Sequence, residues 1–442
     1  MKIETTQATV FPLKNATDFK QKALIWAEKH AKIVCCLDNN GYTEGLIPSD
    51  FECLLAIGAA GEIFNTTDKT SFLRLQAFHA ERKNWLFGFL AYDLKNDIEA
   101  LDSTHFDGLN FPDMHFFEPQ ILLKISAKSV EFMKNTEGSS NFEIFQKMGN
   151  QTLITSQPLN LSVENRFTKV DYLATVERIK QHIQRGDIFE MNFCQEFFVE
   201  DAHINPAALF NELNHLGQAP FSAFYKLQDH YIMCASPERF LKKTGLKLVS
   251  QPIKGTSKRG NTEGSDWDLK NALRTDPKNR SENVMIVDLV RNDLGKISET
   301  GTVAVTELFG IYSFPTVHQM ISTVESQLRA DLPFAEALRQ TFPMGSMTGA
   351  PKVRAMQLIE QYERTRRGVY SGAIGYITPD GDFDFNVVIR SILYNSTQKY
   401  ASFQVGGAII ADSDAEKEYA ECQVKAANLF RVLTGKTDIV TC

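Results

Sequence analysis

Apolar residues recur at helical spacing in a few segments of the chain and in short, strand-like runs in many others. Tyr172, Val176 and Ile179 fall on one face of a helix, so the pattern predicts a helix over 171–184. A second helix is predicted over 18–32. Runs rich in β-branched and aromatic residues predict strands over 33–37, 52–57, 85–92, 188–198, 221–226, 231–235, 247–253, 303–308, 373–377, 385–393 and 400–410.

Many of the predicted strands follow one another without an intervening helix. Consecutive strands of this kind pair antiparallel, so we expect an α+β protein with helices on the outside. The first 150 residues appear aromatic-rich and irregular, and polar, turn-rich segments follow at 134–141 and 152–160. We therefore expect an N-terminal lobe over 1–150 and a catalytic region over 165–442, joined in one intertwined two-lobed unit.

Composition and charge narrow the function classes. The 442 residues are 43% hydrophobic and carry a net charge of −7, so we expect no nucleic-acid partner. The longest apolar run, 53–61, is far shorter than the ~20 residues that span a bilayer, and the N-terminus has no apolar signal core. We expect a cytoplasmic protein without membrane contact, whose seven cysteines are reduced packing residues.

Five segments combine glycine with charged or hydroxyl residues, and all of them lie in the second half of the chain. We expect them to gather around one pocket. The segment 345–352 reads GSMTGAPK and lacks the spacing of a Walker phosphate loop, so we interpret it as free amides at the entrance of a helix over 351–362. The five segments cover 236–240, 251–256, 281–294, 345–352 and 406–413.

Three carboxylates and one lysine in these segments suggest chemistry. Glu418 and Glu421 are three apart on a predicted helix, and Glu282 adjoins an apolar run. An oxygen-only set suits Mg²⁺, although a solvated acidic face would look the same. Lys254 stands at a strand end where an amine could act as nucleophile, with Glu238 as general acid, although most such lysines only reach out to solvent.

Six segments in a fixed order resemble the signature of the chorismate-utilising enzymes. The likeness covers about 170–433, with weaker likeness earlier. It implies two large, mostly antiparallel β-sheets that face each other, with helices outside and the pocket between the sheets. The segments are PIKGT, SENVMIVDLVRNDLG, GSMTGAPK, YSGAIGYI, FNVVIRS and GGAIIADSDAEKEYAE.

Within this family, Lys254 matches the lysine of the aminodeoxychorismate synthase branch, where anthranilate synthases have alanine. The resemblance implies that Lys254 attacks C2 of chorismate while Glu238 protonates the leaving C4 hydroxyl, and that ammonia then enters at C4 and expels the lysine. It also implies Mg²⁺ bound directly by Glu282 and Glu421 and through water by Glu418. Substrate contacts are implied for Gly255, Thr256, His318, Ser346, Tyr370, Arg390, Gly407 and Ala408.

The sequence departs from the family pattern at two positions. Glu190 stands where relatives often have glutamine, and Asn279 where they have an acidic residue. Isochorismate and salicylate synthases carry a lysine at the Glu190 position, so its absence argues against those two activities. Neither departure falls on Lys254 or Glu238.

The resemblance also implies partners. The chain has no Gly-x-Cys-x-Gly-His segment, so we expect ammonia to come from a separate glutamine amidotransferase subunit and the product to remain 4-amino-4-deoxychorismate, without a lyase step. Two alternatives stay open: an anthranilate synthase large component and a non-catalytic chorismate-binding partner. The first is disfavoured by Lys254 and by Leu-Asp-Asn-Asn at 37–40, where tryptophan-sensing members have Leu-Leu-Glu-Ser.

Overall fold

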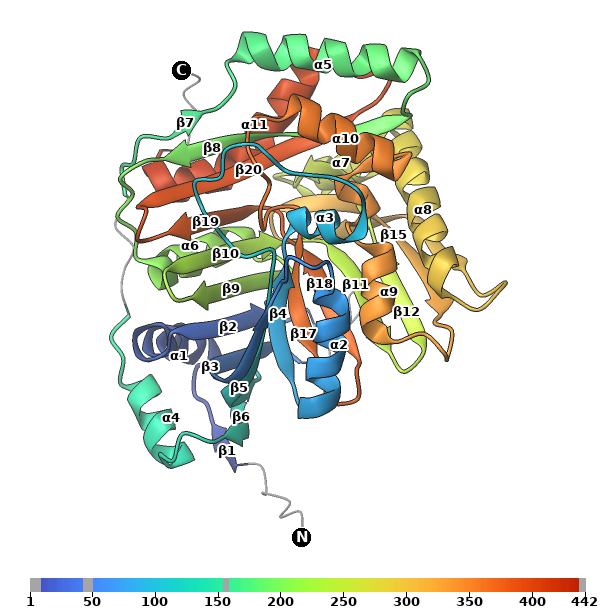
Figure 1. The fold of residues 1–442 in the computed structure, drawn as a ribbon. Coiled ribbons are helices and arrows are strands. Elements are labelled where there is room, and N and C mark those ends of the chain that lie inside the picture. Colours follow the sequence, from blue (N-terminus) through green and yellow to red (C-terminus); the bar gives the residue numbers. More distant parts are fainter. Residues whose placement is uncertain (1–8, 43–50, 154–158, 437–442) are drawn as a thin grey trace.

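Two antiparallel sheets, continuous through one shared strand, form the centre of the protein (Figure 1). The computed structural model describes residues 9–42, 51–153 and 159–436. Strand β5 (Met114–Ile125) has β3 (Cys53–Phe64) along one edge, with β4 (Leu86–Leu90) and β6 (Ser129–Asn135) sharing the other. The predicted α+β fold of two mostly antiparallel sheets with helices outside is confirmed.

The first sheet begins with β1 and β6 and runs across the view in Figure 1 to β8. Its strands beyond β3 come from both halves of the chain, because β2 pairs with β9. Short strands β7 and β16 pair with β8. In spatial order after β3 the strands are β2 (Ile33–Asp38), β9 (Phe221–Leu227), β10 (His230–Ser236), β19 (Ser391–Asn395), β20 (Tyr400–Ile409) and β8 (Glu190–Val199), and both β7 (Glu164–Asn165) and β16 (Gly349–Ala350) lie along the outer edge of β8. At the opposite end of the sheet, β1 (Thr9–Pro12) pairs with β6.

The second sheet starts at β4, which pairs with β17, so this sheet also joins distant parts of the chain. The last long strand, β15, has β12 and β13 on one edge and β14 on the other. In spatial order after β4 the strands are β17 (Ala373–Ile377), β18 (Phe383–Val387), β11 (Arg239–Thr244), β12 (Lys247–Gln251), β15 (Val317–Gln327) and β14 (Ala304–Ser313), and β13 (Ile253–Lys258) follows β12 along the same edge of β15.

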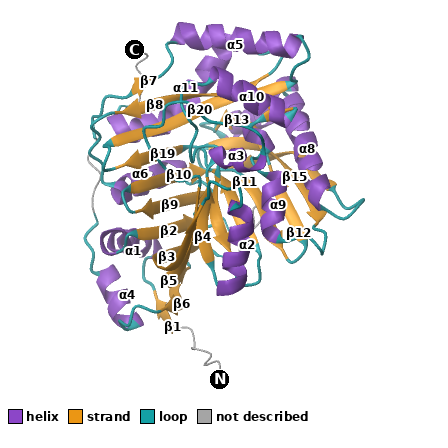
Figure 2. Ribbon diagram, viewed as in Figure 1, coloured by secondary structure: helices purple, strands orange, loops and turns teal. Residues whose placement is uncertain are grey.

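Helices cover the outer faces of both sheets (Figure 2). Helices α1, α6, α10 and α11 contact the first sheet, and α7 and α8 contact the second. The helices are α1 (Ala16–His30), α2 (Ser71–Arg82), α3 (Lys95–Ile98), α4 (Asn141–Gly149), α5 (Lys169–Gln184), α6 (Pro206–Gly217), α7 (Glu263–Thr275), α8 (Pro277–Ile297), α9 (Phe334–Thr341), α10 (Lys352–Tyr362) and α11 (Ala415–Thr434), with 3₁₀ turns at Tyr92–Leu94 and Gly345–Met347.

The first sheet is buried on both faces, and β2 shows how its sequence allows this. Ile33 and Cys35 face the core between the two sheets, whereas Val34 and Cys36 face the core beneath the helices. Successive side chains of a strand point to opposite faces, so a strand with apolar cover on both sides reads as a continuous apolar run. This is why these strands lack a hydrophobic-polar alternation.

Several elements differ from their predicted form. The first 150 residues are regular, because β5 alone contributes twelve residues to the sheet. The predicted strand over 385–393 is two strands: β18 pairs in the second sheet and β19 in the first. Between them Arg390 has φ +54°, a left-handed conformation that ends one strand and redirects the chain. Strand β15 carries His318.

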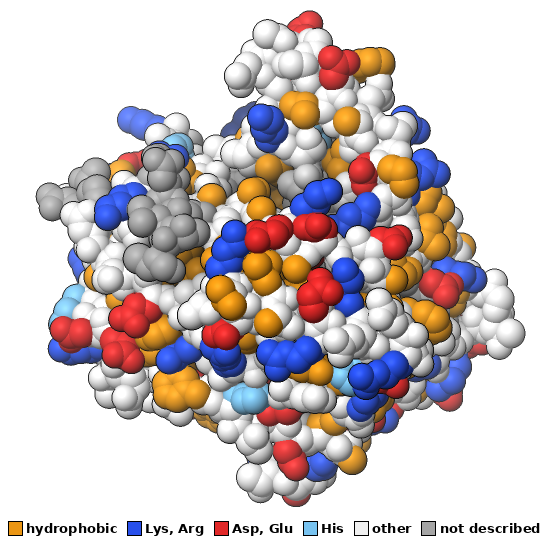
Figure 3. Space-filling model, turned by 90° about the horizontal axis from the view of Figure 1, so that it is seen from above, with side chains coloured by type: hydrophobic (Ala, Val, Ile, Leu, Met, Phe, Trp, Pro, Cys, Tyr) orange, Lys and Arg blue, Asp and Glu red, His pale blue; other side chains and the backbone are white. Residues whose placement is uncertain are grey.

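Surface and cysteine features agree with the composition. On the face shown in Figure 3, basic and acidic side chains lie interspersed rather than in a single-sign patch. Within the described ranges, no helix combines the length and the apolar character needed to cross a bilayer. The six cysteines in those ranges are free and buried, as expected, and Cys442 lies outside them.

We expect Phe224→Ala to lower the free energy of unfolding by about 3–5 kcal/mol, the usual cost of removing a buried phenylalanine ring. Phe224 is fully buried on β9 opposite Cys36, where the early and late parts of the chain meet. Urea unfolding measures the change. The control Phe189→Ala, at a residue 69% exposed, should stay within about 0.5 kcal/mol of wild type; equal losses in both variants would contradict the assignment.

Candidate functional site

The partly buried Lys254 ammonium lies among four carboxylates, at the end of the second sheet. Its positive charge acts on the pKa values of Glu190, Glu238, Glu282 and Glu421. Within the described part of the chain, none of these carboxylates is within ion-pair distance of its Nζ. The fold therefore presents an amine with no fixed partner in acidic surroundings.

Glu238 precedes β11 and is buried at 5% exposure. The hydroxyl of Ser346 and the backbone N–H of Ile253 contact its carboxyl group. Burial raises the pKa of Glu238 to about 7, and these hydrogen bonds and Lys254 only partly offset that effect. A carboxyl group with this pKa is partly protonated near neutral pH, as a general acid requires.

The buried side chain of Lys352 holds the loop that carries Ser346 in place. Lys352 Nζ donates to Asp293 Oδ2 at 2.5 Å and to the carbonyl oxygens of Pro343 at 2.8 Å and Thr341 at 3.2 Å. These contacts connect the start of α10 to α8. The GSMTGAPK segment is thus fixed by its lysine, and the helix it opens begins at Lys352 with Pro351 as N-cap.

The three predicted acidic residues come together between α8 and α11. Glu282 lies on α8, and Glu418 and Glu421 lie on α11. Lys278 Nζ is 2.8 Å from Glu418 Oε1 and 3.6 Å from Glu282 Oε1, and Lys425 Nζ is 2.8 Å from Glu421 Oε1. Lys425 lowers the pKa of Glu421 to about 2, whereas burial raises the pKa of Glu282.

This acidic set has the donor chemistry of a magnesium site. All its ligating atoms are carboxylate oxygens, and buried Glu282 Oε1 makes no hydrogen bond with a described residue. In the described ranges, however, no group of three or more acidic, histidine or cysteine side chains lies close enough together to hold a metal ion. The carboxylate oxygens of these residues suit a hard cation such as Mg²⁺. Lys278 occupies the space between Glu282 and Glu418.

The predicted substrate-binding residues of β20 and the crossover segment adjoin this set. A Cβ built on Gly407 would lie 3.5 Å from Glu418 Oε2, so the backbone passes directly over the carboxylates. Arg390 Nη1 donates to the Lys425 carbonyl oxygen at 3.0 Å, and Lys425 Nζ donates to the Gly406 carbonyl oxygen at 2.7 Å. Desolvation lowers the pKa of Arg390, and nearby Tyr370 opposes that shift.

Two hollows lie at the site, one beside Glu238 and the other beside Arg390. One has a volume of only about 20 Å³ and is lined by Glu238 and Ser346 among others. The other has a volume of about 90 Å³ and is lined by Thr256, Arg390 and Lys425 among others. The predicted residues therefore border two small hollows, both well below the size of a typical ligand pocket.

Gly255 and His318 have different surroundings. Gly255 has φ +91° and packs against Asn279, since a Cβ there would lie 3.0 Å from the Asn279 side chain. His318 is fully buried and its ring contacts Asp266 Oδ1 at 2.9 Å and Ser313 Oγ at 2.9 Å. The structure thus does not bring the His318 ring to Lys254, and its substrate role stays a prediction. Ala408 is buried on β20 beside Gly407.

Sequence reasoning missed two site residues, Lys278 and Lys425. Each lies four positions from a carboxylate on the same helix, Lys278 from Glu282 and Lys425 from Glu421. Pairs at this spacing face each other on a helix, so the pattern was visible. It was not distinctive, because most such pairs lie on exposed surfaces.

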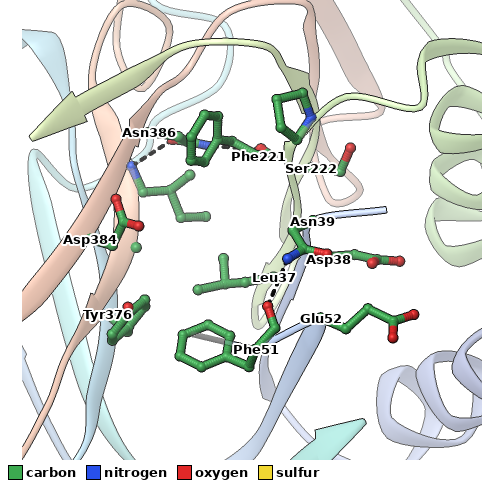
Figure 4. Close-up of a pocket in the computed structure, with 13 residues that line it drawn as sticks. Leu37, Asp38, Asn39, Phe51, Glu52, Phe221, Ser222, Tyr376, Asp384 and Asn386 are labelled. Carbon is green, nitrogen blue, oxygen red and sulfur yellow. Dashed lines mark hydrogen bonds between the residues drawn. The ribbon is translucent and has the colours of Figure 1, made fainter. Parts of the chain in front are cut away.

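A separate cavity of about 40 Å³ lies between the sheets near β2 and β18 (Figure 4). Its wall includes residues 37–39, part of the segment that differs from the Leu-Leu-Glu-Ser of tryptophan-sensing members. Asn39 donates to the Phe51 carbonyl oxygen at 2.8 Å, and Asn386 to the Phe221 carbonyl oxygen at 2.9 Å. None of the candidate catalytic or acidic residues lines this cavity.

The site thus combines the Lys254 amine, the raised-pKa acid Glu238 and an acidic cluster between α8 and α11. The chain matches the chorismate binding enzyme family over residues 34–431, and it belongs to that family. The structure of anthranilate synthase component I from Streptococcus pneumoniae TIGR4 resembles it with a TM-score of 0.74 and 27% identity, over 88% of this chain and 93% of that one.

Two curated relatives carry a different name from that structure. A Bacillus subtilis (strain 168) protein named aminodeoxychorismate synthase component 1 is 34% identical over 360 residues, which is 78% of this chain and 76% of the relative. A Streptomyces griseus protein named aminodeoxychorismate synthase is 43% identical over 274 residues, 61% of this chain. That match covers only 37% of the Streptomyces protein, which is much longer.

The raised pKa of Glu238 predicts a pH-dependent stability. The folded protein retains this proton up to about pH 7, whereas an ordinary glutamate loses it near 4.5, so this group destabilises the fold as pH rises through that window. Glu238→Gln stays neutral and should gain up to about 3 kcal/mol over wild type between pH 5 and 8. Urea unfolding at both pH values measures this gain. The exposed Glu137→Gln control should show none, and a gain in Glu238→Gln independent of pH would refute the interpretation.

Proposed function

We propose that this protein is the synthase component that converts chorismate and ammonia to 4-amino-4-deoxychorismate, a precursor of p-aminobenzoate and folate. The observation that carries the proposal is Lys254, a free amine beside a protonatable Glu238. The relatives named aminodeoxychorismate synthase support this choice within the family.

The proposed reaction uses these two side chains in turn. Glu238 gives its proton to the C4 hydroxyl, which leaves as water while the Lys254 amine nitrogen bonds to C2, the ring double bonds shift, and the proton released by that nitrogen passes to the Glu238 carboxylate. Ammonia then bonds to C4, the double bonds shift back, and Lys254 leaves as an amine with the proton of Glu238, which the new C4 amino group replaces. Atoms balance as chorismate plus ammonia giving aminodeoxychorismate plus water.

Chorismate carries two carboxylates, and the proposal assigns each to a different group. Arg390 and Tyr370, with the backbone of Gly407 and Ala408, would bind the enolpyruvyl carboxylate, since a guanidinium can donate two parallel hydrogen bonds. Glu282 and Glu421, with Glu418 through water, would hold Mg²⁺. When bound, the cation would neutralise the ring carboxylate and orient the ring.

Ammonia would come from a separate glutamine amidotransferase subunit. The name "component 1" of the Bacillus relative is in keeping with a second component. We propose a heteromeric complex in which this chain supplies the chorismate site.

The main alternative is an anthranilate synthase, the name of the Streptococcus structure. It would aminate chorismate at C2 and release pyruvate, and it needs no nucleophilic lysine at position 254. A non-catalytic chorismate-binding partner is the second alternative, and the presence of Lys254, Glu238, Glu282 and Glu421 together disfavours it. Identifying the product formed from chorismate, Mg²⁺ and ammonium by mass spectrometry separates all three.

We expect Lys254→Ala to lose aminodeoxychorismate formation on the order of a thousandfold or more, because removing a covalent nucleophile removes the route itself. Intact mass spectrometry of wild-type protein quenched with chorismate without ammonia should show the adduct, and the variant should show none. Lys258→Ala, at an exposed residue of the same strand, is the control and should keep both activity and adduct. Wild-type turnover by Lys254→Ala would exclude the covalent route.

Glu282→Gln and Glu421→Gln should each raise the Mg²⁺ concentration needed for half-maximal activity by at least about tenfold, since each removes a charged ligand. Glu418→Gln should have a smaller effect, because it acts through water. Steady-state rates across a Mg²⁺ titration measure this. Full wild-type activity in excess EDTA would remove the metal from the proposal.

A further inference from the structure

Lys278 connects α8 and α11 at the centre of the acidic set. Its Nζ is 2.8 Å from Glu418 Oε1 and 3.6 Å from Glu282 Oε1. The two carboxylates are nearly enclosed, with side chains 2% and 10% exposed, whereas the Lys278 side chain is 40% exposed. The ammonium thus reaches inward to two buried anions from a partly exposed position.

The two contacts are unequal. The Glu418 contact is a hydrogen-bonded ion pair, whereas the Glu282 contact is too long for a hydrogen bond, and Glu282 Oε1 has no other hydrogen-bond partner among the described residues. A buried carboxylate oxygen without a partner costs free energy. One ammonium therefore neutralises this pair incompletely, and a divalent cation with several ligand positions would do so better.

An ammonium and a divalent cation cannot both lie between Glu282 and Glu418, because two positive charges at such a distance repel strongly. Lysine has a flexible four-carbon side chain and a strongly hydrated head group, so it can leave one position and be solvated in another. The exposed side of Lys278 opens directly to water.

We propose that Lys278 is an internal counter-ion that holds Glu282 and Glu418 before the metal binds and moves out to solvent when the metal enters. Lys278 then sets the cation concentration at which the site fills. This inference rests on the metal part of the proposed function and adds a positioning residue that acts through the metal ligands.

The first test is Mg²⁺ binding by isothermal titration calorimetry on the full chain without chorismate. Lys278→Met should lower the Kd for Mg²⁺ about tenfold, because the cation no longer has to displace an ammonium. Lys278→Arg, which retains the charge, should bind within about threefold of wild type. Lys169→Met is the matched control, because Lys169 of α5 pairs at 2.8 Å with exposed Glu416, which lies on α11 as Glu418 does, and it should leave the Kd unchanged.

The second test uses the wild-type protein, so it does not depend on the folding of a variant. The rate at which an amine-reactive acetylating reagent modifies Lys278, followed by peptide mass spectrometry, should rise severalfold on addition of Mg²⁺, while the rate at Lys169 stays constant. An unchanged or weaker Mg²⁺ affinity in Lys278→Met, or a Lys278 modification rate that Mg²⁺ does not raise, would overturn the counter-ion role.

The outcomes separate this inference from the proposed function. Aminodeoxychorismate formation with a Mg²⁺ Kd that Lys278→Met does not lower rejects the inference alone. Absence of Mg²⁺ binding in both wild type and Lys278→Met rejects the inference together with the metal assignment. Binding seen only in Lys278→Met supports the inference, since the ammonium then excludes the cation at the concentrations used.

Discussion

The site depends on one constraint. Charged side chains buried between the sheets and their outer helices must each have a partner that neutralises them. Lys352 is held by Asp293 and two carbonyl oxygens, and Lys425 by Glu421 and a third carbonyl oxygen. Removing one partner from such a pair leaves an uncompensated charge and is strongly destabilising. Lys254 differs, since its carboxylate neighbours act on it only through space. The structure thus holds the Lys352 and Lys425 side chains in place by hydrogen bonds, whereas the Lys254 amine has no such partner.

The segment between β18 and β19, where the chain passes from the second sheet to the first, sets the relative positions of Glu238 and Arg390. The chain leaves the second sheet after Val387 and enters the first at Ser391, with Arg390 at the turn. On this path the Val387 N–H donates to the Glu238 carbonyl oxygen at 3.0 Å, and the Arg390 carbonyl oxygen accepts from the Ala235 N–H at 3.2 Å. The backbone that positions the acid therefore also positions the guanidinium, so the spacing of these two groups is a property of the sheet junction.

The sequence predicted the class of fold and many elements of the second half, because helices such as α5 have a clear 3.6-residue period. It failed where burial on both faces removes the strand period, as in β5, and where one apolar run serves two sheets, as around Arg390. Lys254 and the acidic residues were singled out by their place in the glycine-containing polar segments, the resemblance implied their roles, and the structure brings them together. Lys278 was not found, because only its distance to Glu418 on another helix distinguishes it from an ordinary surface lysine.

The pairing of β2 with β9 and of β4 with β17 has a consequence for how the chain folds during its synthesis. Strand β4 ends at Leu90, and its partner strand β17 begins at Ala373, so the first strands leave the ribosome long before their partners exist. Strands β3 and β5 can pair early, but the second edge of β4 stays open until almost the whole chain has been synthesised. Contacts this distant in sequence form slowly, and an open apolar strand edge is prone to wrong pairing. Translation order therefore leaves the N-terminal strands as the part of this protein most dependent on protection during synthesis.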